Sequence, residues 1–188
     1  LDSVPSSTSI TRSAVGTTSG LVFTTQPQVT IVDSASQPVL LGSYTVRARI
    51  TSGAGGSLIG TTSASTTRGV ANFSGLGIRG VAGTQYTISY EVDNLTAATQ
   101  NVTVTPGAAT RLSLVQSASG AQNAVSFVTQ PRVSILDAEG NIVTSASDPI
   151  SVAIISGAGG TIAGSTSQVA ASGVLSFVGL GMRGVAGR

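Results

Sequence analysis

The sequence contains 188 residues, with nine arginines, seven acidic residues and no lysine, histidine or cysteine. The net charge of +2 comes from scattered single arginines, so the chain lacks the basic cluster with which proteins bind nucleic acid. Without cysteine there are no disulfides, and without histidine, lysine and cysteine the Ser-His-Asp, Ser-Lys and Cys-His catalytic groups are excluded. No apolar run approaches the ~20 residues of a membrane span.

Short runs in which apolar and polar residues alternate predict β-strands. In residues 86–92, Tyr86, Ile88, Tyr90 and Val92 alternate with polar residues, the period of two that marks a strand with one buried face. Gly, Ser, Pro and Asn separate the runs, as they do in turns. In chain order the expected strands are residues 8–12, 21–25, 28–31, 46–50, 57–63, 69–74, 86–92 and 99–105. Such a series of short strands in about 100 residues predicts an all-β fold, an antiparallel sandwich of the immunoglobulin-like (Ig-like) type.

The second half of the chain repeats the first. Shifted by 104 positions, residues 7–84 align with residues 111–188 without a gap, and 33 of the 78 aligned pairs are identical. The agreement is clearest between FTTQPQVTIVD and FVTQPRVSILD, between the two copies of SGAGG, and between GLGIRGVAG and GLGMRGVAG. A period of this length corresponds to a whole domain, so we expect two tandem Ig-like sandwiches.

The order of these segments resembles the bacterial Ig-like repeats that are strung along large surface proteins and adhesins, such as the stalks of invasin and intimin. The resemblance covers nearly the whole chain and is carried by TTQPQVTIVDSASQPV, RITSGAGGSLIGTTSASTT, GVANFSGLGIRGVAGTQYTISY and NLTAATQNVTVTPGAATRL. It implies an exported, extracellular or cell-surface protein whose repeats act as spacers or associate with one another. It implies no catalytic residues, because that family has none to transfer.

The repeat sets the expected domain boundaries. The first domain comprises residues 1–107, of which residues 1–6 align with the linker TPGAAT at 105–110, and the second comprises residues 108–188. So short a linker is expected to hold the domains end to end with limited bending. The second domain lacks counterparts of residues 85–104, the last two strands, and would therefore expose backbone donors and apolar side chains. We expect it to be completed either by a longer natural chain or by a strand from a neighbouring molecule.

The repeated motif GLGIRGVAG lies between an apolar strand that ends near Phe73 and the strand that begins near Tyr86. We interpret it as the place where the chain crosses from one sheet to the other, with Leu76 and Ile78 filling the end of the sandwich. Glycines there would allow positive φ angles and close backbone approach. The alternative, a phosphate-binding loop, needs a following helix, and none is predicted. The glycines assigned to this structural role are Gly75, Gly77, Gly80, Gly83, Gly179, Gly181, Gly184 and Gly187.

One segment of the second copy has the spacing that opens a calcium-binding loop. In DAEGN, Asp137, Glu139 and Asn141 stand at alternate positions, but the acidic residue that would close such a loop is missing. The first copy, DSASQ, keeps only Asp33. A hairpin turn, in which Asp and Asn bond local backbone groups and Gly140 has a positive φ, explains both copies better. We therefore expect no metal ion and no organic cofactor.

Four charged residues are expected to pair on the surface of the first domain. Arg47 and Arg49 face outward on one strand, and Glu91 and Asp93 face outward on its antiparallel neighbour. Two carboxylates ~7 Å apart along a strand also resemble the pair of a glycosidase in their spacing. Because both lie on the same exposed face, we interpret them as solvated surface acids.

The sequence as a whole favours a structural function without enzymatic activity. We expect a stalk or fibre segment outside a bacterial cell, with further copies of the repeat, in the same chain or in neighbouring protomers, as partners. Few charges and a mean hydropathy of +0.36 favour self-association into a filament. The alternative is an adhesive module that binds a glycan or a protein through loops or an exposed sheet edge. Glycosylation at the sequons of Asn72, Asn94 and Asn101 would require a glycosylating secretory route.

Overall fold

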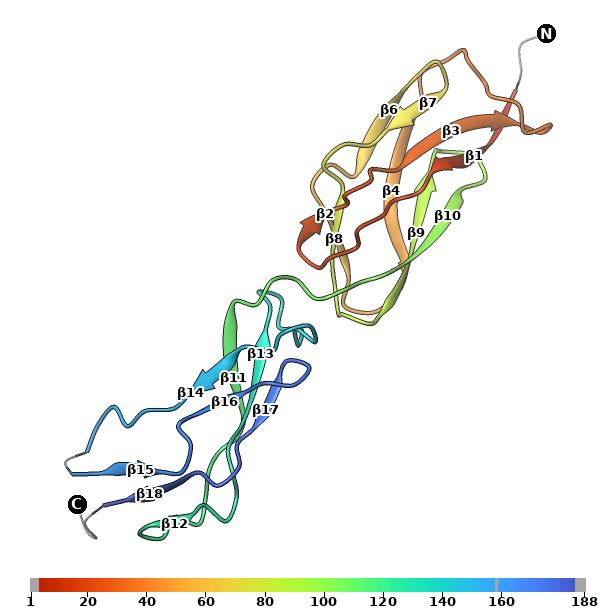
Figure 1. Cartoon of the computed structure of the whole chain (residues 1–188). Helices are drawn as coiled ribbons and strands as arrows, with labels where there is room; N and C mark the ends of the chain where they lie inside the picture. Colours follow the sequence, from red (N-terminus) through yellow and green to blue (C-terminus); the bar gives the residue numbers. More distant parts are fainter. Residues whose placement is uncertain (1–3, 158, 185–188) are drawn as a thin grey trace. The chain divides into compact units, whose positions relative to one another are not determined.

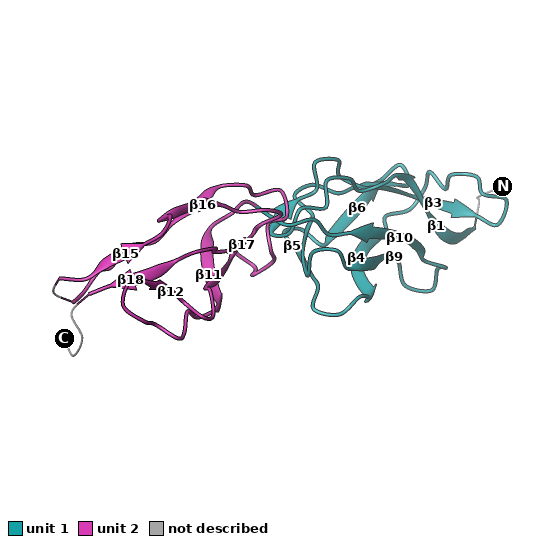
Figure 2. Cartoon of the chain, turned by 60° about the horizontal axis from the view of Figure 1, so that its bottom comes forward, with its two compact units in different colours: residues 1–107 teal, residues 108–188 magenta. Residues whose placement is uncertain are grey.

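The computed structural model describes residues 4–157 and 159–184, and the chain forms two compact units, residues 1–107 (unit 1) and 108–188 (unit 2) (Figure 2). The regular elements of the described residues are β-strands, and the strands within each sheet pair antiparallel. The predicted all-β fold is confirmed. In this part of the chain we find no helix with the length and apolar character of a membrane span.

Unit 1 is built from short strands separated by turns (Figure 1). Two of these strands were not expected from the sequence: β6 (Ser63–Thr67) follows a turn at Gly60 inside the predicted strand 57–63, and β8 (Gly77–Arg79) lies inside the glycine motif. Neither shows an apolar period of two, because β8 has three residues and β6, with the sequence SASTT, contains a single apolar residue, Ala64. Residues 1–6 also differ from the expected linker, because β1 already begins at Pro5. The strands are β1 (Pro5–Arg12), β2 (Leu21–Val22), β3 (Gln28–Asp33), β4 (Thr45–Ser52), β5 (Ser57–Ile59), β6 (Ser63–Thr67), β7 (Val70–Asn72), β8 (Gly77–Arg79), β9 (Gln85–Glu91) and β10 (Ala98–Thr103).

The strands of unit 1 form two sheets. The larger sheet has the order β1-β3-β7-β6-β4-β9-β10, and the smaller sheet has the order β2-β8-β5. The two edges of the larger sheet approach each other (Figure 1), where Thr8 N–H donates to Thr96 O (2.9 Å) and Thr96 N–H donates to Ser6 O (3.0 Å). The larger sheet therefore closes around the core, and the chain visits the smaller sheet at β2, β5 and β8.

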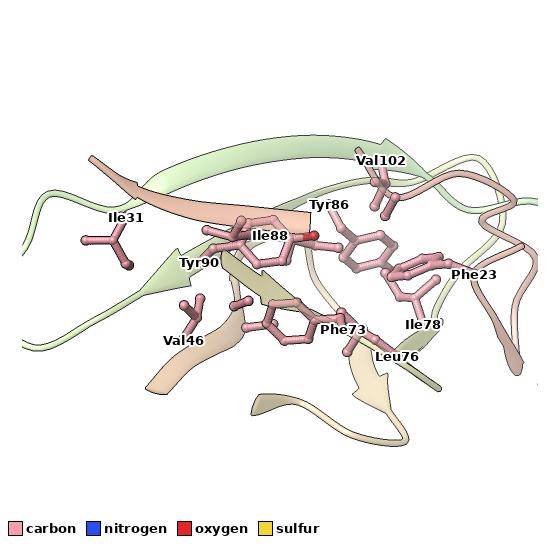
Figure 3. Packing of buried hydrophobic residues seen from close by; sticks show 14 of the residues in the cluster. Phe23, Ile31, Val46, Phe73, Leu76, Ile78, Tyr86, Ile88, Tyr90 and Val102 are labelled. Atoms are coloured by element: carbon pink, nitrogen blue, oxygen red, sulfur yellow. The ribbon is translucent and has the colours of Figure 1, made fainter. Parts of the chain in front are cut away.

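The core of unit 1 is filled by side chains from both sheets (Figure 3). The strand β9 supplies three fully buried side chains, Tyr86, Ile88 and Tyr90, as its alternating pattern predicts. The rings of Phe73 and Tyr90 meet edge to face, with their centroids 5.6 Å apart. Truncating a buried side chain of this size to alanine costs roughly 3–5 kcal/mol, so β9 contributes a large share of the stability of unit 1.

Unit 2 repeats the strands β1 to β8 of unit 1. Most of its pairings recur as well, since β12 (Val125–Ser126) pairs with β18 (Gly181–Arg183) as β2 pairs with β8. The pairing of β6 with β7 is reduced to a single bridge between Ala171 and Val174. Among the described residues of unit 2, no strand corresponds to β9 or β10. The strands are β11 (Arg111–Gln116), β12 (Val125–Ser126), β13 (Arg132–Leu136), β14 (Pro149–Ser151), β15 (Thr161–Ala163), β16 (Ser167–Val169), β17 (Val174–Ser176) and β18 (Gly181–Arg183).

The strand β14 shows what the missing partner does to its neighbour. Its counterpart β4 pairs with β6 through residues 45–47 and with β9 through residues 47–52. In unit 2 only the first part persists, and β14 keeps the three residues that pair with β16. A strand therefore forms in unit 2 only where a partner supplies its hydrogen bonds.

Candidate functional site

The glycine motif of unit 1 carries the chain from the larger sheet to the smaller one and back. Gly75 and Gly83, its first and last glycines, have positive φ angles of 70° and 82°. Gly77 stands against β2, and a Cβ atom there would lie 2.3 Å from a backbone oxygen. Leu76 and Ile78 are fully buried. The motif is thus a structural crossing that requires glycine for its φ angles and for close approach.

The second copy of the motif has the same geometry where the structure describes it. Gly179 has a φ angle of 69°, and a Cβ atom on Gly181 would lie 2.3 Å from Val125 O. Gly187 lies outside the described residues. The crossing is therefore a feature of the repeat and not of one unit.

Tyr86 joins the glycine motif to the other repeated glycine segment, SGAGG. A Cβ atom on Gly53 or Gly56 would lie 2.3 or 2.2 Å from the ring of Tyr86, and one on Gly80 would lie 2.8 Å from its hydroxyl oxygen. We call these three glycines the tyrosine cradle. Because each Cβ atom would overlap the buried ring, the cradle accepts the ring only while all three positions are glycine.

The hydroxyl group of Tyr86 ties the same two segments together. It donates to Ala54 O (3.0 Å) and accepts from Val81 N–H (2.9 Å), five residues before it in the chain. A tyrosine at the start of such a strand, bonded to backbone a few residues upstream, is a feature of Ig-like sandwiches. The alternation of apolar residues in β9 predicts that Tyr86 is buried, but it does not predict the hydrogen bonds of its hydroxyl group. The sequence signal for these contacts is that both glycine segments recur in the second copy.

Gln26 joins two segments in which the chain of unit 1 passes between the sheets, the one between β2 and β3 and the one between β7 and β8, through three hydrogen bonds. Its Nε2 donates to Phe23 O (2.8 Å) and Leu76 O (2.9 Å), and its Oε1 accepts from Leu76 N–H (2.9 Å). Gln130 makes the same three bonds in unit 2, with the residues 104 positions further along. Hydrophobic periodicity does not reveal this role, but the recurrence of the triplet TQP in both copies is a signal for it.

Arg47 and Arg49 lie beside Glu91 and Asp93 on neighbouring strands. The strands β4 and β9 pair antiparallel, with Arg47 Nη1 3.6 Å from Asp93 Oδ1 and Arg49 Nη1 3.7 Å from Glu91 Oε2. The side chain of Asp93 is 87% exposed, so water screens these pairs and each contributes at most about 1 kcal/mol. Both carboxylates face arginines on an exposed strand face, which lacks the desolvation that a glycosidase acid needs.

Asp137 closes a hairpin turn with its buried carboxylate. Oδ1 accepts from Asn141 N–H (2.7 Å), Oδ2 accepts from Asn141 Nδ2 (2.9 Å), and Gly140 has a φ angle of 91°. Glu139 is half-buried in the same turn. In unit 1, Asp33 Oδ1 likewise accepts from two N–H groups of its own turn (2.9 and 2.8 Å). Both copies of this aspartate hold a turn, and the described residues contain no group of three His, Cys, Asp or Glu side chains placed for a metal ion.

Tyr90 lies in the core of unit 1, and its hydroxyl group has no hydrogen-bond partner among the described residues. Burial raises the pKa of this hydroxyl group above its ordinary value of about 10. The cause is desolvation, because the ring packs among apolar side chains of the core. We therefore interpret Tyr90 as a packing residue.

The asparagines of the three sequons are all exposed. Asn72 lies in β7 and Asn101 in β10, while Asn94 lies in the turn between β9 and β10 with a φ angle of 65°. Asn72 Oδ1 accepts from Gln28 Nε2 (2.7 Å), and Asn101 Oδ1 accepts from the Thr87 hydroxyl group (2.9 Å). Of the three, Asn94 has the position in a turn that is typical of a modified asparagine.

The recurring segments of the two units thus hold turns and sheet crossings in place. No protein-family model matches the chain, and the search of curated proteins found no match. Among solved structures, the chain is similar to the "Structure of surface layer protein SbsC, domains 4-9", with a TM-score of 0.36 and 17% sequence identity. The similarity covers 87% of this chain and 25% of that one. It is too low to argue for a common fold or function.

Proposed function

We propose that this chain is a segment of a bacterial cell-surface or extracellular protein built from tandem Ig-like repeats. Its repeats act as spacers that transmit tension, and the chain is not an enzyme. The gapless repeat, the strand order and the contacts of Tyr86 support the Ig-like assignment. The observation that carries the proposal is the way in which the two ends of unit 1 are held together.

The first and last strand segments of unit 1 run parallel to each other and are joined by backbone hydrogen bonds. Near one end, residues 6–8 form two backbone hydrogen bonds with Thr96, with donor–acceptor distances of 2.9 and 3.0 Å. Near the other end, residues 17–19 form two with Thr105, both of 2.9 Å. These segments lead directly to the two ends of the unit. We call this set of contacts the terminal clamp.

The side chain of Gln100 adds two bonds in the middle of the terminal clamp. Its Nε2 donates to Ala14 O (2.7 Å), and its Oε1 accepts from Ala14 N–H (2.9 Å). The parallel segments are therefore bonded near both ends and between them.

A pull on the two ends of unit 1 slides the clamped segments past each other. Because the segments are parallel, all bonds of the terminal clamp are stretched together, whereas a pull across a hairpin would open its bonds one after another. The lifetime of a unit under force follows its unfolding rate. This geometry therefore suits a domain that has to stay folded while tension passes through it.

The linker supports the spacer part of the proposal. Thr105 belongs to the terminal clamp, and Thr110 N–H donates to Leu136 O (2.8 Å) within unit 2. Only residues 106–109 separate these two anchored positions, and Pro106 restricts the backbone further. So short a connection limits the range of angles between successive repeats.

A distance measurement tests whether the repeats act as a spacer. Ser65→Cys and Val169→Cys place nitroxide labels at equivalent exposed positions of β6 and β16 in a chain without other cysteines. Pulsed electron paramagnetic resonance should give one narrow distribution of the distance between the two nitroxides. Inserting about ten Gly and Ser residues after Gly107 should broaden this distribution. If the distance distribution of the labelled chain without the insertion is as broad as that of the insertion variant, the repeats do not act as a spacer of defined length.

Neighbouring copies of the repeat are the proposed partners. Leu40 and Leu41, next to each other in the loop between β3 and β4, are 53% and 68% exposed, an apolar pair that association would cover. Sedimentation velocity at increasing concentration should show self-association that Leu40→Ser and Leu41→Ser weaken. Association that is unchanged in the double variant would exclude this loop.

A further inference from the structure

The peptide bond between Asp148 and Pro149 combines two groups that favour cleavage of the backbone. Asp148 is the only aspartate of the sequence that precedes a proline. An aspartate carboxylate reaches the carbonyl carbon of its own residue by closing a five-membered ring. The nitrogen of a bond to proline is a tertiary amide without an N–H group, and it leaves as a secondary amine. The two residues therefore supply a nucleophile and its leaving group.

The carboxylate of Asp148 is free to act as the nucleophile. Asp148 is exposed and lies directly before β14. Its carboxylate makes no hydrogen bond or ion pair within the described part of the chain, whereas the carboxylates of Asp33 and Asp137 each close a turn. Pro149 is exposed as well, and so is its counterpart Thr45 in unit 1. The exposure of this position is therefore common to both copies of the repeat.

A backbone hydrogen bond holds the carbonyl group that the carboxylate would attack. Ala170 N–H donates to Asp148 O (3.2 Å) beside the paired strands β14 and β16. The bond belongs to the repeat, because Thr66 N–H donates to Tyr44 O (2.8 Å) at the equivalent place in unit 1. When a nucleophile adds to a carbonyl group, negative charge develops on the oxygen, and an N–H donor already in position stabilises that charge. The strand pairing thus places a donor where the reaction needs one.

The residues on either side keep the bond in this position. Ala146 is buried, and its carbonyl oxygen accepts from Gly173 N–H (2.9 Å). Ile150 is buried in the core of unit 2. Residues 147–149 between these two anchors are exposed, so water reaches the bond while the backbone around it stays fixed.

We propose that the bond between Asp148 and Pro149 is a self-cleavage site that the fold of unit 2 promotes. A carboxylate oxygen of Asp148 bonds to the carbonyl carbon of the same residue, and the bond from this carbon to the nitrogen of Pro149 breaks. The nitrogen takes a proton from the solvent and becomes a new amino terminus. One water molecule then opens the cyclic anhydride and leaves two carboxyl groups on Asp148. The proposal goes beyond the spacer function and does not depend on it.

The cleavage should run faster in acid, because the leaving nitrogen has to take up a proton. The segment 167–173, which bonds to this part of the chain, contains no titratable side chain. Arg111 lines the same opening as Asp148 and is the other charged residue there, and arginine keeps its proton throughout the acid range. The rate should therefore be low near neutral pH and rise as the pH falls.

A cut at this bond leaves unit 2 held together by strand pairing. The pairs β13–β17 and β12–β18 each join a strand before the cut to a strand after it (Figure 1). The two fragments therefore stay together until denaturant or tension separates them. Cleavage replaces a covalent connection by one that force can open.

The test compares two Asp–Pro bonds in one chain. Val4→Asp creates a second such bond before Pro5, at an exposed residue whose carbonyl oxygen accepts no hydrogen bond within the described part of the chain. Mass spectrometry under denaturing conditions follows both cuts between about pH 3 and about pH 7. In native buffer the natural bond should break about tenfold faster, the effect of one hydrogen bond to the carbonyl oxygen. In urea the two rates should become equal.

Two variants of this chain identify the reacting groups. Asp148→Ala removes the nucleophile, and Pro149→Ala replaces the leaving group by an ordinary N–H amide. Both positions are exposed, so hydrogen exchange in β13 should stay as slow as in the parent chain. Each variant should lose the cut at position 148 and keep the cut before Pro5.

Three results would overturn the proposal. The first is the absence of a cut after Asp148 in acid, and the second is a cut that persists in Asp148→Ala. The third is an equal rate at both bonds without urea, including the case in which unit 2 is unfolded at every pH that cleaves the chain. The cleaved chain should also elute from a size-exclusion column in native buffer as the uncut chain does, and separation of the fragments there would contradict the role of the strand pairs.

Discussion

Alanine in place of Gly56 should destabilise unit 1, whereas alanine at its counterpart Gly160 should leave unit 2 unchanged. A Cβ atom at Gly56 would lie 2.2, 2.6 and 2.9 Å from three ring carbons of Tyr86. The ring cannot move away freely, because it is fully buried and its hydroxyl group holds two hydrogen bonds. At Gly160 the nearest atom would be 3.5 Å away, an ordinary contact.

The size of the effect follows from these contacts. Overpacking of this kind costs about 1–3 kcal/mol, and displacement of the ring would also lose a hydrogen bond worth about 1 kcal/mol. The free energy of unfolding of unit 1 should fall by about 2–4 kcal/mol, equivalent to at least ~8 °C in Tm for a unit of this size. For Gly160→Ala we expect a change within about 0.5 kcal/mol.

Hydrogen exchange followed by mass spectrometry measures the two units separately. Exchange in β9 should accelerate in the Gly56→Ala variant, and exchange in β13 should stay the same in the Gly160→Ala variant. Equal effects of the two substitutions would refute the reasoning, because they would show that the ring of Tyr86 does not require the cradle.

Three further predictions concern unit 1. Gln26→Leu removes the three bonds that join the segments beside β2 and β8, and it should lower the free energy of unfolding in urea by about 2–4 kcal/mol. Gln28→Leu, whose two side-chain bonds are exposed, should change it by less than about 0.5 kcal/mol, and equal losses in the two variants would contradict the role of Gln26. Tyr90→Phe removes a hydroxyl group without a partner and should leave stability unchanged or raise it by about 1 kcal/mol. Because burial raises the pKa of Tyr90, the unfolded chain loses the hydroxyl proton at a lower pH than the folded chain. The free energy of unfolding, measured by urea denaturation at several pH values, should therefore fall as the pH rises above about 10, and it should fall less steeply in Tyr90→Phe. The same pH dependence in both proteins would be evidence against this burial effect. A double-mutant cycle of Arg49→Ala and Glu91→Ala should give a coupling of about 0.2–1 kcal/mol that disappears in 1 M salt, and coupling that persists would mean that the pair is not solvent-screened.

The sequence predicts those features of the fold that depend on local pattern. The alternation in β9 identifies a core strand because Tyr86, Ile88 and Tyr90 repeat every second residue, and all three are buried. The strand β8 escapes prediction because three residues between glycines carry no clear period. The contacts of Gln26 with Leu76 also escape it, because they join residues 50 positions apart.

Aligning the two copies of the repeat predicts more than hydrophobic periodicity does, because both copies encode the same order of strands. It shows that residues 85–104 have no counterpart in the second copy. It does not show that β14 shortens to the part that β16 supports, because strand length depends on hydrogen bonds from a partner. Nor does it identify the cradle, which only the position of the Tyr86 ring between three glycines makes visible.

Single-molecule pulling on unit 1 tests the central claim, that the terminal clamp resists tension between the two ends. Cysteines at Val4 and Ala108 attach the ends, so that force slides the clamped segments. Cysteines at Val4 and Ala35 instead place force across the antiparallel pair β1–β3, at the end where Pro5 pairs with Asp33. At one loading rate, we expect a higher rupture force between the ends than across the β1–β3 pair. The difference should be smaller in the Gln100→Ala variant, which keeps the four backbone bonds of the terminal clamp but loses the two bonds of the side chain. Equal rupture forces in the two geometries would contradict the proposed function.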